Sequence, residues 1–153
     1  MSKKGRFIDI RVDHNVYESS QKGMRIHTKF SVDNLKGIHC CAAAYFYFSS
    51  GEKLEDFNNL YSSTDGQVSV GSDFTPGYNS STFNDFKLFM PYSELHMADG
   101  KHDLKFYVKL YVKGGDFFAS SKYIHFTYTS NSDTDLSADE QMIVEKFRKL
   151  RRK

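Results

Sequence analysis

The sequence contains no tryptophan, two prolines and two cysteines among its 153 residues. The cysteines, Cys40 and Cys41, are adjacent, so in an extended chain their side chains point to opposite faces and a mutual disulfide would be strained. We therefore expect two reduced thiols, as in a protein of the cell interior. The scarcity of proline and the aromatic content of 16% favour ordered strands over a disordered chain.

Long apolar runs and an excess of one charge are also lacking. No stretch approaches the roughly 18 apolar residues of a membrane-spanning helix, and Ser2 to Arg6 does not lead into the apolar core of a signal peptide. With 21 basic and 19 acidic residues, the net charge of +2 offers no overall attraction for nucleic acid or an anionic membrane. We expect a cytoplasmic protein with no transmembrane segment and no nucleic-acid partner.

Local motifs for catalysis and metal binding are absent as well. The sequence has no Gly-x-Ser-x-Gly elbow and no phosphate-binding loop. No two of its six histidines have the close spacing of a zinc motif, although His27, His39 and His125 share an outward parity in their predicted strands. No loop carries the packed acidic residues that calcium requires. We therefore expect no enzyme, no metal and no cofactor.

Alternation of apolar and polar residues is what the chain does contain. The clearest case is the segment 101–112, where every second residue from Leu104 to Val112 is apolar and the residues between them are Lys or Tyr. This is the period of a strand with one buried face. Gly114-Gly115-Asp116 then predicts a hairpin turn, and the aromatic and β-branched segment 117–128 predicts the returning strand.

The register of this hairpin can be predicted further. If Gly114-Gly115 alone formed the loop, Ile124 and Phe126 would face water, because one residue of slip moves every side chain to the other face. A three-residue loop, or a bulge near Ser120-Ser121, would return both side chains to the core. We expect one of the two.

Several further segments are also predicted to be strands: 6–14, 24–32, 38–48, 67–70 and 83–90. Between the first two we expect a loop over 15–23. The segment 38–48 has no polar face, which predicts a strand in the centre of a sheet, either covered on both sides or with an outer face that is an interaction surface. The total of seven or eight strands predicts an all-β fold, an antiparallel β-sandwich of immunoglobulin-like or C2-like type.

The composition changes after Tyr128. We predict a β-sandwich domain over 1–128, a polar linker over 129–136 and a short C-terminal α-helix over 137–153. Ser137 and Glu140 form a capping-box pattern, and the end of the helix is strongly basic. One face of this amphipathic helix would carry an apolar stripe made of Ile143, Phe147 and Leu150. The stripe must be buried, either against the sandwich or against another chain.

A second candidate surface lies on the predicted strand 101–112. Its outward side chains alternate between charge and aromatic ring: Lys105, Tyr107, Lys109 and Tyr111. Such rows hold sugars, single strands or acidic peptides in other proteins. However, an ordinary wet sheet face also carries Tyr and Lys, because both bury a stem and keep a polar tip in water. Both interpretations stay open at this stage.

Four segments resemble a β-sandwich module of bacterial multidomain proteins, where it is attached to signalling, protease-like or repeat domains: Gly23-Met24-Arg25-Ile26-His27, Ala44-Tyr45-Phe46-Tyr47, Tyr61 to Gly66 and Phe89-Met90-Pro91-Tyr92. The resemblance covers about residues 7 to 128, and the terminal helix lies outside it. It implies an accessory recognition role. We therefore expect a non-catalytic interaction module that binds a protein partner or self-associates. A carbohydrate- or anionic-lipid-binding module is the alternative, and an enzyme with a spatially assembled site is the third hypothesis.

Overall fold

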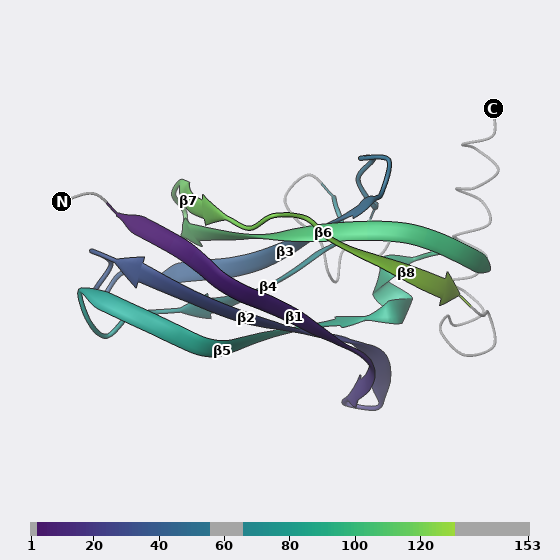
Figure 1. Cartoon of the computed structure of the whole chain (residues 1–153), viewed down its shortest axis with the longest axis horizontal. Helices are drawn as coiled ribbons and strands as arrows, with labels where there is room; N and C mark the ends of the chain where they lie inside the picture. Colours follow the sequence, from purple (N-terminus) through teal and green to yellow (C-terminus); the bar gives the residue numbers. More distant parts are fainter. Residues whose placement is uncertain (1–2, 56–65, 131–153) are drawn as a thin grey trace.

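The computed structural model describes residues 3–55 and 66–130, and within them the chain is an antiparallel β-sandwich of two sheets (Figure 1). The elements are β1 (Lys4–Glu18), β2 (Gln21–Asp33), β3 (Cys40–Phe48), β4 (Ser69–Phe74), β5 (Ser80–Pro91), a 3-10 turn η1 (Tyr92–Leu95), β6 (Gly100–Val112), β7 (Phe117–Ser120) and β8 (Ile124–Ser130). The predicted all-β sandwich is confirmed. The predicted terminal helix, with Ile143, Phe147 and Leu150, lies outside the described residues.

The two sheets differ in size. The smaller sheet has the order β1-β2-β5, and the larger sheet has the order β4-β3-β6, with β7 and then β8 on the far edge of β6. Strand β6 thus has neighbours along both edges, because it pairs with β3 over Cys40 to Phe48 on one side. No helix among the described residues is long and apolar enough to cross a membrane.

The core lies between the sheets and is built from the inward side chains of each strand. On the smaller sheet the fully buried ring of Phe30 lies at its centre, with four other phenylalanine rings at centroid distances of 5.1 to 5.9 Å. On the larger sheet the rings of Phe46 and Phe106 are 5.3 Å apart. Burial of one such side chain contributes roughly 1.5–3 kcal/mol to folding.

Strand β3 is an inner strand, as its lack of a polar face predicts. Cys40, Ala42 and Ala44 are fully buried in the core between the sheets. The alternate residues, Cys41 and Ala43, are also buried although they belong to the outer face of the sheet. The two cysteines are free thiols on opposite faces, as the alternation predicts.

The first hairpin corrects the predicted loop over 15–23. Strand β1 continues to Glu18, strand β2 begins at Gln21, and the connection is the two-residue turn Ser19-Ser20. Both serines have positive φ, 50° and 67°, which is the geometry of a type I′ hairpin turn. The prediction failed because serine lacks the Asn-Gly signal of such turns, and because the tip of the hairpin is exposed and shows no apolar alternation.

The second hairpin has the predicted bulge. Leu110 pairs with Ala119, but Phe106 pairs with Ile124, so the register shifts by one residue between β7 and β8. Ser121 holds this bulge, because its backbone N–H donates to the carbonyl of Val108 and its hydroxyl accepts from the Val108 N–H. As a result, Ile124 and Phe126 pack against the core. The strand continues two residues beyond the predicted domain end, to Ser130.

Candidate functional site: the outer face of the larger sheet

The outer face of the larger sheet carries a continuous group of aromatic rings and lysines. We call it the aromatic–lysine face, and it consists of Tyr45, Tyr47, Lys105, Tyr107, Lys109, Tyr111, Phe117 and Tyr123. Its residues come from β3, β6, β7 and the bulge between β7 and β8. Most of these side chains are half-buried, while Tyr123 is 44% and Phe117 is 58% exposed.

The ring of Tyr107 is the centre of this face. It lies 5.9 Å from the ring of Tyr45, which is its direct cross-strand partner, and 5.9 Å from the ring of Tyr47. On its other side the ring of Tyr123 is 5.2 Å away, and Tyr123 also makes an edge contact with Tyr47 at 5.6 Å. Tilted and edge-to-face pairs at these distances contribute about 0.5–1.5 kcal/mol each, so the rings also stabilise the sheet.

The two lysines of the face lie over aromatic rings. The Lys105 ammonium is 4.3 Å from the centroid of the Tyr123 ring. The Lys109 ammonium is 4.7 Å from the centroid of Phe117, 5.4 Å from that of Tyr107 and 5.6 Å from that of Tyr45. Within the described part of the chain, no carboxylate lies within ion-pair distance of either ammonium.

The protonation of the face follows from its packing. A hydrogen bond with the Tyr107 side chain raises the pKa of Lys109, so this lysine carries its charge at neutral pH. Burial raises the pKa of Tyr47 and of Tyr111, so both hydroxyls stay neutral. The face therefore combines fixed positive charge with neutral hydroxyl groups.

The sequence predicted half of this site. The structure places Lys105, Tyr107, Lys109 and Tyr111 on one outer face, with Tyr111 at one end beside its cross-strand partner Cys41. Tyr45 and Tyr47 were not predicted as site residues, although their alternation in β3 carried the signal. Phe117 and Tyr123 were missed because their placement depends on the hairpin register. Ile143, Phe147 and Leu150 lie outside the described residues.

The outer face of the smaller sheet is different, because several of its charged groups pair with each other. Arg25 meets Glu18 at 3.1 Å, and Arg11 meets Asp13 at 3.0 Å. His27, 8% exposed, lies between Asp13 and an aspartate of β5, with a ring nitrogen within 3 Å of each carboxylate. These contacts neutralise part of the charge on this face.

The histidines do not form a cluster. His27 belongs to the smaller sheet, whereas His125 is on β8 of the larger sheet and His39 precedes β3, where its ring contacts the Thr75 hydroxyl. Among the described residues, no group of three histidine, cysteine or acidic side chains is arranged to hold a metal ion. Burial raises the pKa of the Cys40 and Cys41 thiols, which disfavours the nucleophilic thiolate.

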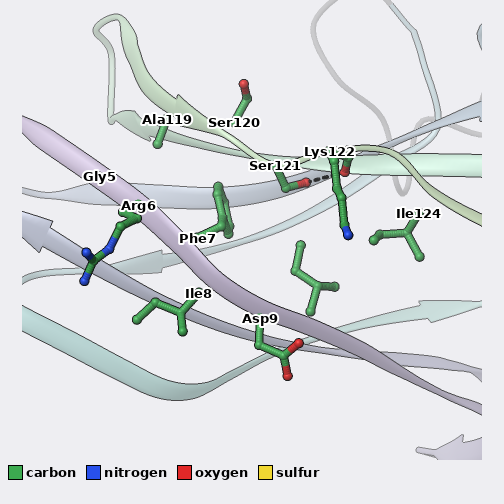
Figure 2. Close-up of a pocket in the computed structure, with 11 residues that line it drawn as sticks. Gly5, Arg6, Phe7, Ile8, Asp9, Ala119, Ser120, Ser121, Lys122 and Ile124 are labelled. Carbon is green, nitrogen blue, oxygen red and sulfur yellow. Dashed lines mark hydrogen bonds between the residues drawn. The ribbon is translucent and has the colours of Figure 1, made fainter.

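A groove of about 640 Å³ separates the edge of β1 from β7 and the bulge (Figure 2). Figure 2 shows the ring of Phe7 on the side of β1 that faces this gap, while Ile8 and Asp9 point the other way. At one end the sheets approach closely, since a Cβ on Gly5 would lie 2.8 Å from the Phe118 ring. The lining mixes apolar and charged side chains, so the groove lacks the concentration of aromatic and cationic groups seen on the outer face.

Comparisons with known proteins add little. No protein-family model matches the sequence, and no curated protein matches it. Among solved structures, a crystal structure of a protein from Archaeoglobus fulgidus is similar, with 16% identity and a TM-score of 0.36 over 82% of this chain and 98% of that chain. Similarity at this level indicates neither a function nor a partner.

Proposed function

We propose that this β-sandwich is a non-catalytic interaction module, and that the aromatic–lysine face is its recognition surface for a partner protein. The observation that supports this most directly is the packing of three tyrosine rings around Tyr107 on an outer face. Tyrosine is enriched at protein interfaces because its rigid ring offers a large contact area together with a hydroxyl group. A sheet face whose only role is to contact solvent would not require this concentration of aromatic rings.

The finer parts of the proposal concern fold type and setting. We propose an immunoglobulin-like or C2-like sandwich that acts in the cytoplasm as an accessory domain of a bacterial protein. Self-association is the second form of the same function, in which another copy of the chain is the partner. A carbohydrate- or anionic-lipid-binding module using the same face is the alternative function, because sugars stack on tyrosines and lysines attract phosphate.

The proposal is tested by selecting binders from a displayed library of random peptides of about twelve residues, a length that covers an extended segment across a sheet face. The whole chain is compared with a variant that combines Tyr45→Ala and Tyr107→Ala, after circular dichroism has shown that both are folded. Tyr123→Ala, at a more exposed ring, serves as a milder second variant. Tyr78→Ala is the matched control, because Tyr78 is 73% exposed and lies outside the face.

We expect peptides that bind the whole chain and the Tyr78→Ala control but lose most of their affinity for both ring variants. Enrichment that is equal for the whole chain and the Tyr45→Ala, Tyr107→Ala variant would contradict the proposal. The carbohydrate alternative would be favoured by saturable binding on a glycan array that the tyrosine substitutions abolish, if no selected peptide depends on the same tyrosines. Light scattering of the whole chain then reports self-association: a dimer that the ring variants turn into a monomer identifies a second copy as the partner.

A further inference from the structure

We infer that the segment bound by the aromatic–lysine face is acidic and extended, with two carboxylates spaced to meet Lys105 and Lys109. This inference rests on the function proposed above and names the chemistry of the partner. It begins with the charges on the two outer faces of the sandwich, which are arranged differently.

On the smaller sheet, several charged groups pair with a neighbour. Arg25 pairs with Glu18, and Lys87 lies 3.5 Å from a carboxylate oxygen of Asp85. On the larger sheet, Lys113, the residue after β6, pairs with Asp73 at 2.6 Å. Lys105 and Lys109 differ from Lys113, because no described carboxylate lies within ion-pair distance of their ammonium groups. The positive charge of the face is thus available to an anionic partner.

The rings hold the two ammonium groups in place. Lys109 lies over three rings and Lys105 over one, so neither lysine has the freedom of an ordinary surface side chain. A fixed ammonium loses less conformational entropy when it pairs with a carboxylate. The same contacts argue against a neutral sugar, because the ammonium groups already occupy the ring faces on which a sugar would stack.

The spacing of the two lysines defines the shape of the ligand. They lie four residues apart on one strand, which corresponds to about 13 Å between their Cα atoms. An extended peptide with acidic residues at positions i and i+4 reproduces this spacing. Its residue i+2 would lie over Tyr107, between the two lysines, so we expect an aromatic or apolar side chain there. A lipid headgroup would meet one lysine at a time and has no such pattern.

The test uses the peptides selected on the whole chain. We expect their sequences to share two acidic residues four positions apart, with an apolar or aromatic residue between them. Binding should weaken about tenfold or more in a Lys105→Gln, Lys109→Gln variant, and also when NaCl is raised from about 50 to 300 mM. The matched control is Lys101→Gln, because Lys101 lies on the outer face of the same strand, away from the rings, and should leave binding unchanged.

Several outcomes would overturn the inference, and they separate it from the proposed function. If the selected peptides are neutral, and bind the lysine variant normally but not the tyrosine variant, the inference of an acidic segment is contradicted and the proposed interaction function is retained. No ring-dependent peptide at all would remove both. Vesicles with about 30% phosphatidylserine that bind through Lys105 and Lys109, in the absence of peptide binding, would assign the face to a membrane instead.

Discussion

Asp85 and His27 are joined across strands β2 and β5 by a hydrogen bond of 2.7 Å between Oδ1 and Nδ1. The other ring nitrogen, Nε2, lies 2.9 Å from Oδ2 of Asp13 on β1. A carboxylate only accepts hydrogen bonds, so a ring nitrogen that carries a proton donates to the carboxylate beside it. One side chain therefore connects all three strands of the smaller sheet.

Replacement of His27 should destabilise the protein. In His27→Leu both hydrogen bonds are lost and two carboxylates are left close together, so we expect unfolding to become easier by roughly 1–3 kcal/mol. Urea denaturation followed by circular dichroism measures this change. Lys87→Ala is the control. Replacement of this exposed lysine removes a charge from the same face without breaking the connection between the strands. Equal stability of His27→Leu and the native protein would show that His27 does not stabilise the sheet.

The same cluster predicts loss of stability in acid. The hydrogen bond from His27 lowers the pKa of Asp85 below its usual value of 3.8. A carboxyl with a lowered folded-state pKa contributes stability that is complete above its unfolded pKa and is lost as pH falls through its folded pKa. The urea midpoint should therefore decrease as pH falls below about 4, and decrease less in Asp85→Asn. An identical pH dependence in both proteins would contradict this.

Gly23 lies where the backbone of β2 closely approaches that of β5. A Cβ built on Gly23 would lie 2.3 Å from the carbonyl oxygen of Met90 and 2.8 Å from the Cα of Pro91. Because backbone atoms cannot move aside cheaply, Gly23→Ala should cost about 1–3 kcal/mol in stability. The control is Gly77→Ala, where a Cβ would meet nothing within 4 Å. Thermal unfolding compares the two, and a similar midpoint for both would be unexpected.

Phe30 should be among the most sensitive core positions. It is fully buried and its ring contacts those of Phe7, Phe74, Phe83 and Phe86. Phe30→Ala leaves a cavity that the neighbouring rings cannot fill, so we expect a loss of about 3–5 kcal/mol. Chemical denaturation should show a far smaller effect for Tyr78→Ala. A loss below about 1 kcal/mol for Phe30→Ala would mean that the sheets collapse around the cavity.

The two thiols should react slowly in the folded protein. Burial raises the pKa of both Cys40 and Cys41, and the thiolate is the reactive form. With a disulfide reagent such as dithionitrobenzoate at neutral pH, the native protein should react many times more slowly than the protein in urea. The two rates should approach each other only as the pH rises above the usual thiol pKa. Rapid reaction of native Cys41 at neutral pH would show that its outer face opens readily.

The strands could be predicted because period-two patterning is local. Strand β6 and the bulge before Ile124 follow from the requirement that apolar side chains face inward. The continuous hairpin of β1 and β2 could not be predicted, because Ser19-Ser20 has no turn signal and the residues around it are exposed. The 3-10 turn η1 could not be predicted from the alternation of apolar and polar residues either, because the burial of its side chains depends on long-range packing.

The candidate site was predicted only as far as one strand extends. Lys105 to Tyr111 alternate within β6, so their common face is visible in the sequence. The contribution of Tyr45 and Tyr47 depends on β3 being the neighbour of β6, which is a matter of strand order. The position of Tyr123 over Lys105 depends on the one-residue bulge. Local periodicity predicts neither the strand order nor the position of Tyr123, so these remaining residues of the face could be identified only in the three-dimensional structure.

The pairing of β3 with β6 also has a consequence for folding during synthesis on the ribosome. Strand β3 is synthesised about fifty residues before β6, and until then one of its edges and both of its faces lack their final cover. Cys40 to Phe48 is apolar on both sides, which is the composition of a segment that pairs with other chains when left open. The nascent protein therefore carries an aggregation-prone strand with one edge unpaired until Gly100 to Val112 has been synthesised.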